Sequence, residues 1–127
     1  MKNKTSEFQG WRYLSLIIAL IVVSIQSFAY DFIVDGIYYK ITNSATKEVA
    51  VTLQYYSPGG RYEDATIISD YTGDVIVPSS VNYEGITYAV TSIDNHAFDD
   101  SDVTSVSMPN TIQSIGQSAF AYCNYET

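Results

Sequence analysis

The stretch that decides the fold is VTSIDNHAF at residues 90–98, which recurs as IQSIGQSAF at residues 112–120. Four apolar positions match at a constant spacing of 22 residues. The matching pairs are Val90 and Ile112, Ile93 and Ile115, Ala97 and Ala119, and Phe98 and Phe120. A period in the low twenties is typical of short solenoid coils, and one such coil is too small to bury its own apolar face. These eight residues are therefore predicted to form a repeat core that stacks on neighbouring coils.

A second element recurs around a proline. The segment VIVPSSV at residues 75–81 resembles VSMPNTI at residues 106–112, which aligns Pro78 with Pro109. The first copy carries nine extra residues between Val81 and Val90. They contain Glu84-Gly85, a dipeptide that favours a tight hairpin turn. Both copies are thus predicted to share one repeat plan, with a hairpin inserted in the first.

The preceding half of the chain is predicted to form antiparallel strands. Two apolar runs at residues 32–34 and 37–41 flank Asp35-Gly36, which suits a two-residue type I′ turn. Residues 48–56 form a β-branched run of alternating character. No sustained helical period follows residue 29, so the fold class is predicted to be mainly β, without long helices.

The repeats resemble the BspA-type leucine-rich repeat of bacterial surface proteins. The match is carried by residues 106–109, residues 112–116, Ala119-Phe120 and Cys123. The earlier unit departs from it, because Asp94 replaces the glycine and Ser101 stands where the cysteine would be. The resemblance implies an N-terminal antiparallel β cap at residues 30–72. The cap would lead into a short leucine-rich-repeat solenoid at residues 73–127, with a strand and a short helical turn per unit.

The resemblance also implies a function: an exported, non-catalytic binding or adhesion module of a leucine-rich-repeat surface protein. Its expected partner is a host or bacterial surface macromolecule, either a protein or a glycan. The alternative is a structural capping fragment of a longer array, with no ligand of its own. Solenoids usually need three or more units, and at most two are visible here. A truncated array or a degenerate family member is therefore expected.

The N-terminal segment, residues 1–29, has the features of a secretion signal. Lys2, Lys4 and Arg12 precede a twelve-residue apolar run at residues 14–25. Small residues then lead to a predicted cleavage site between Ala29 and Tyr30. An uncleaved membrane anchor is the alternative, although a spanning helix needs about twenty apolar residues. The predicted location is secreted or at the cell surface.

Charge narrows the range of partners. After residue 29 the chain keeps three basic residues against thirteen acids, a formal charge of −10. A surface this negative repels phosphate backbones and anionic lipid headgroups. Nucleic acid is therefore excluded as a partner, and no membrane association is expected after signal cleavage.

Few residues suggest chemistry. The single histidine, His96, is interpreted as a surface-turn residue, and the single cysteine, Cys123, as a buried structural thiol. The acidic cluster Asp94, Asp99, Asp100 and Asp102 could hold Ca²⁺, although a solvated turn explains it equally well. No catalytic, phosphate-binding or zinc motif is present. The chain is predicted not to be an enzyme and to need no cofactor.

Overall fold

The computed structural model describes residues 28–57 and 66–123. Within these ranges the chain forms strands and turns and no helix, which confirms the prediction of a mainly β fold. The strands are β1 (Phe32–Val34), β2 (Ile37–Asn43), β3 (Glu48–Thr52), β4 (Tyr55–Ser57), β5 (Thr66–Ile68), β6 (Thr72–Ile76), β7 (Ser80–Tyr83), β8 (Ile86–Ile93), β9 (Asp102–Ser107) and β10 (Ser114–Ile115).

Two tight hairpins lie where the sequence predicts them. β1 and β2 pair across Asp35-Gly36, whose φ angles are +50° and +77°. β7 and β8 pair across Glu84-Gly85, with φ angles of +49° and +78°. Two consecutive left-handed residues give a type I′ turn, whose twist matches that of the flanking strands.

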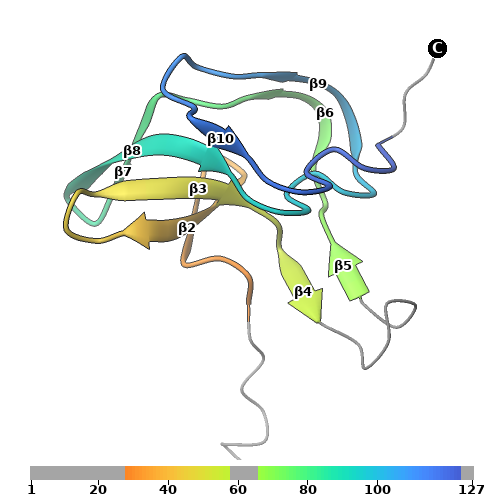
Figure 1. Cartoon of the computed structure of the whole chain (residues 1–127), viewed down its shortest axis with the longest axis horizontal. Helices are drawn as coiled ribbons and strands as arrows, with labels where there is room; N and C mark the ends of the chain where they lie inside the picture. Colours follow the sequence, from red (N-terminus) through yellow and green to blue (C-terminus); the bar gives the residue numbers. More distant parts are fainter. Residues whose placement is uncertain (1–27, 58–65, 124–127) are drawn as a thin grey trace, which may run out of the picture.

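Three strands from distant parts of the chain run parallel in one sheet. β3 pairs with β8, which places Val51 beside Ile93, and β8 pairs with β10, which places Ile93 beside Ile115. Figure 1 shows β2, β3, β8 and β10 lying side by side in this order. The 22-residue spacing of the sequence repeat is therefore the offset between paired residues of β8 and β10.

The hairpin inserted in the first copy also belongs to this sheet. β7 pairs with the first half of β8, from Ile86 to Ala89, and β10 pairs with its last residues, Ser92 and Ile93. The nine extra residues thus extend β8 and supply a partner for that extension.

A second parallel pair, β6 and β9, follows the proline-centred element. Val75 lies beside Val106, and the N–H of Val77 donates to the carbonyl of Ser107 at 2.9 Å. This register is the one expected from aligning Pro78 with Pro109. In Figure 1 the two strands run alongside each other above the sheet that contains β8.

Hydrogen-bonded turns at residues 94–101 and 116–123 stand where short helical turns were expected. The φ angle is +59° at His96 and +54° at Ser118, and it is +54° at Asp100 and +53° at Tyr122. A left-handed residue every fourth position is incompatible with a right-handed helix. The two turns stack in parallel through N–H donation from residues 96, 98 and 100 to carbonyls of residues 117, 119 and 121, at 3.1, 2.8 and 2.9 Å.

One hydrophobic core joins the N-terminal strands to the repeats. Tyr39, Val49 and Val51 lie in it together with Val90, Ile93 and Phe98. The Tyr71 ring packs on Phe98 of the first coil, with ring centroids 4.7 Å apart, and Ser69 Oγ donates to the carbonyl of Ala97 at 2.7 Å. Residues 30–72 therefore pack directly on the first coil.

The predicted signal segment falls almost entirely within residues 1–27, outside the described residues. At the predicted cleavage site, the N–H of Ala29 donates to the carbonyl of Gln54 at 3.4 Å, and the Tyr30 ring packs on Tyr38. Among residues 28–57 and 66–123, no helix has the length and apolar character needed to cross a bilayer.

Candidate functional site

The eight repeat-core residues lie in three environments. Five are buried: Val90, Ile93, Ala97, Phe98 and Ala119. Ile112 and Phe120 are partly buried against the same core. The side chain of Ile115 is 52% exposed, which differs from the stacking expected of it. Only β8 pairs with β10 among the described strands, so Ile115 lies at the outer edge of the sheet.

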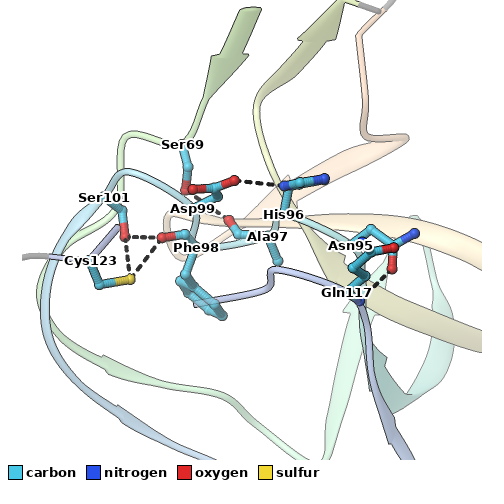
Figure 2. Close-up of polar contacts among 9 residues, drawn as sticks. All are labelled: Ser69, Asn95, His96, Ala97, Phe98, Asp99, Ser101, Gln117 and Cys123. Atoms are coloured by element: carbon cyan, nitrogen blue, oxygen red, sulfur yellow. Dashed lines mark hydrogen bonds and ion pairs between the residues drawn. The ribbon is translucent and has the colours of Figure 1, made fainter. Parts of the chain in front are cut away.

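A histidine–aspartate pair lies on the first coil turn (Figure 2). His96 Nδ1 and Asp99 Oδ2 are 2.6 Å apart, and Asp99 is only 4% exposed. The opposite nitrogen, Nε2, points away from the carboxylate. The His96 ring also stacks on Tyr56, with ring centroids 6.0 Å apart and an interplanar angle of 14°. Two contacts therefore fix the orientation of the imidazole.

Sequence reasoning missed this pair by interpreting His96 as a surface-turn residue. A signal was present in the repeat alignment, because the second coil has Ser118 and Ala121 where the first has His96 and Asp99. His96 and Asp99 are three residues apart on the same turn, and both differ from the residues at the equivalent positions of the second coil. Such a pair of polar substitutions is a candidate for a side-chain interaction.

The His96 side chain lines a cavity of about 630 Å³, which lies between residues 28–31 and the two coil turns. The other lining residues come from the segment before β1, from β2 and β3, from the region around β4 and from both turns. They are Phe28, Ala29, Tyr30, Asp31, Lys40, Thr52, Leu53, Tyr56, Asp94, Asn95 and Gln117. Binding sites for small molecules typically have volumes of about 300–1,000 Å³ and a few well-placed polar groups.

The polar groups of this cavity hold one another in place. Asn95 Oδ1 accepts from the backbone N–H of Gln117 at 2.7 Å, which leaves the amide nitrogen of Asn95 as a donor. The Asp94 carboxylate accepts from Thr52 Oγ1 at 3.1 Å and from the N–H of Asn95 at 2.9 Å. Lys40 Nζ lies 4.0 Å from Asp94 Oδ2. The cavity therefore presents donors and acceptors on a preformed framework.

Comparison with known proteins identifies the coils that carry this site. Residues 78–127 match the family model described as the BspA type leucine rich repeat region (6 copies). These residues are a BspA-type leucine-rich repeat region. This match confirms the resemblance carried by the repeats. No curated protein and no solved structure gives a significant match to the chain.

The single cysteine of the leucine-rich repeat region is a buried free thiol, as the sequence predicts. Cys123 Sγ donates to the carbonyl of Phe98 at 3.0 Å, and Ser101 Oγ donates to the same carbonyl at 2.6 Å (Figure 2). Ser101 stands one repeat period before Cys123. The two equivalent positions thus converge on one acceptor.

The aspartates of the leucine-rich repeat region do not form one metal-ligating group. Asp94 faces the cavity, and Asp99 is buried beside His96. Asp100 is exposed, and so is Asp102 at the start of β9. Across residues 28–57 and 66–123 no cluster of three or more His, Cys, Asp or Glu side chains is arranged to hold a metal ion.

A second cavity, of about 700 Å³, lies where the N-terminal strands meet the leucine-rich repeat region. Asp35, Asp70 and Asp74 line it, and the lining contains no Lys or Arg. The Tyr38 hydroxyl donates to Asp70 Oδ2 at 3.0 Å. The hydroxyls of Thr104 and Ser105 hold Asp74, at 2.9 and 2.6 Å, and they lower the pKa of its carboxyl group. This cavity therefore has an acidic wall, in which hydroxyl groups hold the carboxylates of Asp70 and Asp74.

Proposed function

We propose that this chain is an exported, non-catalytic adhesion module, displayed on or secreted from the cell, that binds a surface protein. The observation that carries the proposal is the BspA-type repeat region, because repeats of this family are generally non-catalytic and mediate protein interactions. The features of residues 1–29 support export. Residues 30–72 act as the cap that seals the first coil.

The charge of the module favours a partner with a basic segment. The chain after residue 29 carries a formal charge of −10, and the acidic cavity has three aspartates without a neighbouring lysine or arginine in its lining. Charge complementarity of this kind speeds association and weakens as salt screens it. The side chains of Asp35, Asp70 and Asp74 are the first candidates for contacts with the partner.

The direct experiment measures binding of the full chain to immobilised extracellular matrix proteins and mucins. We expect saturable binding that weakens as salt is raised. The double variant Asp35→Asn, Asp70→Asn should weaken it further, whereas Asp100→Asn, an exposed aspartate outside the acidic cavity, is the matched control. Absence of saturable binding across the panel at high micromolar concentration would contradict the proposal.

A second candidate function is to seat further repeat coils. The observation that favours it is the complete absence of charged residues from 103 to 123, in a chain that is otherwise strongly acidic. Ile115 and Met108 are exposed in this stretch. Natural proteins usually protect free strand edges with charges, so an uncharged edge favours pairing with another strand.

Light scattering coupled to size-exclusion chromatography tests the second candidate. If β9 and β10 seat further coils, the full chain should self-associate at high concentration. Ser114→Lys, which adds a charge on β10, should restore the monomer. A cooperatively folded monomer at all concentrations would contradict this function and leave the adhesion proposal standing.

A further inference from the structure

The His96–Asp99 pair is not needed to build the turn on which it lies. The second coil forms the same turn with Ser118 and Ala121 at the two positions, and the φ angles of His96 and Ser118 differ by only five degrees, +59° against +54°. Burying a carboxylate costs free energy unless it is paired and hydrogen-bonded. The first coil thus carries a buried acid that the shared backbone does not require.

What the pair does is orient the imidazole. With Nδ1 2.6 Å from Asp99 Oδ2, the neutral ring carries its proton on Nδ1 and leaves the Nε2 lone pair as an acceptor. Tyr56 packs on one face of the ring and restricts its rotation. The resulting unit is a flat, partly exposed ring pair with an acceptor at its edge, on the wall of the 630 Å³ cavity.

The other groups that line the cavity indicate the chemical class of its ligand, because they include both hydrogen-bond donors and acceptors and charges of both signs. Lys40 and the Asn95 amide nitrogen are donors, and the carboxylate of Asp94 retains acceptor capacity beyond its two protein donors. An anionic ligand would meet Asp31 and Asp94, and a cationic ligand would meet Lys40. A neutral molecule with several hydroxyl groups and an apolar ring face satisfies both the polar groups and the ring pair.

We propose that this cavity is a binding site for a neutral saccharide, with the Tyr56–His96 ring pair as its platform. Asp94, Asn95, Lys40 and His96 Nε2 hydrogen-bond its hydroxyl groups, and Asp99 is a positioning residue for His96. The residues named for these roles lie after the predicted cleavage site, although Phe28 and Ala29 also line the cavity. The site lies apart from the acidic cavity, so saccharide binding and protein binding can fail independently.

The test titrates the full chain with neutral monosaccharides and disaccharides, followed by calorimetry and by the His96 ring-proton NMR signals. We expect at least one neutral sugar to bind saturably and shift the ring signals. A uronic acid and an amino sugar of the same ring should bind more weakly. Tighter binding of either charged sugar, or no neutral sugar binding at millimolar concentration, would overturn the proposal.

Variants taken from the second coil make the test specific. His96→Ser and Asp99→Ala install the residues that form the same turn one repeat later, so both are expected to keep the fold, as circular dichroism would check. Each should weaken sugar binding about tenfold or more, equivalent to about 1.4 kcal/mol. Ser118→Ala, at the equivalent turn position outside the cavity lining, is the matched control and should bind normally.

Tyr56→Ala adds a variant on β4, outside the sequence of the coil turns, that removes the other ring of the pair. Loss of sugar binding in this folded variant is expected, because the ring pair would be broken. Unchanged affinity in both His96→Ser and Tyr56→Ala would show that the sugar binds elsewhere, and this outcome would also overturn the site.

Discussion

The turns of the two successive coils, residues 94–101 and 116–123, follow the same backbone path with different side chains. Both place left-handed residues at matching positions, and both put an alanine–phenylalanine pair toward the core. Phe98 is fully buried, whereas Phe120 is only partly buried. The comparison teaches that a few apolar positions and turn conformations define a coil, which leaves its other positions free to acquire a binding role.

The largest expected effect on stability is the difference between replacing Phe98 and replacing Phe120 with alanine. Phe98 has no exposed surface, and its ring stacks on Phe120 and packs at a tilt against Tyr71, at centroid distances of 5.2 and 4.7 Å. Phe98→Ala should lower the free energy of unfolding by about 3–5 kcal/mol, because it opens a cavity in the shared core. Phe120→Ala should cost clearly less. Equal losses in urea denaturation would show that the coils are equally buried.

A high-pH titration tests the environment of two tyrosines of β2, which belong to the core that the N-terminal strands share with the first coil. Burial raises the pKa of Tyr38 and of Tyr39 to about 12 from the ordinary value of 10.0, and Asp70 adds to the effect at Tyr38. A raised pKa means that the folded state keeps a proton that the unfolded state releases. Stability is therefore fully present below pH 10 and falls as pH rises toward 12.

The expected loss at pH 11 is about 1.4 kcal/mol for Tyr39. It is smaller for Tyr38, because solvent screens a hydroxyl group that is only partly buried. Chemical denaturation between pH 9 and pH 11 measures it, and Tyr39→Phe should reduce the slope. A wild-type free energy of unfolding that does not change across this range would contradict the burial of the Tyr39 hydroxyl group.

A smaller effect is expected from adding a methyl group between the coils. A Cβ atom on Gly116 would lie 2.5 Å from the backbone nitrogen of Asn95 and 2.8 Å from the carbonyl carbon of Asp94. Asp94 occupies the equivalent position one coil earlier, where it lies against β3. Gly116→Ala should therefore destabilise the chain by about 1–3 kcal/mol. Thermal unfolding measures this loss, with Gln113→Ala, a solvent-facing change, as the control.

The smallest effect concerns the cysteine and its equivalent serine. Ser101 and Cys123 both donate to the carbonyl of Phe98, so Cys123→Ser keeps a donor on that acceptor. We expect the free energy of unfolding to change by less than about 1 kcal/mol. A loss of several kcal/mol in the same denaturation assay would mean that the packing of the sulfur atom, which a serine oxygen cannot replace, stabilises this position.

The features of the fold that could be predicted from the sequence are those that depend on local turn residues or on the repeat. Asp35-Gly36 and Glu84-Gly85 determine their hairpins locally, and the 22-residue spacing predicts that Ile93 lies beside Ile115. The parallel pairing of β3 with β8 was not predicted, because residues 48–52 show no similarity to the repeat. That pairing depends on contacts between segments about forty residues apart.

The candidate site was less predictable than the fold. Its lining residues run from Phe28 to Gln117 and meet only after the strands and turns have assembled. At residues 94–101 and 116–123 the structure has hydrogen-bonded turns with four left-handed residues, and not the short helical turns that the resemblance implies. The residue types at His96, Asp100, Ser118 and Tyr122 do not by themselves predict the left-handed backbone conformation found there.

The stacking of the two coils is tested most directly by NMR couplings measured across hydrogen bonds in the full, isotope-labelled chain. The structure requires that the amide nitrogen of Phe98 couples to the carbonyl carbon of Ala119, and that of Gly116 couples to the carbonyl carbon of Ile93. Both couplings together would establish the parallel stack at a spacing of 22 residues. Coupling of either amide to another carbonyl group would contradict it.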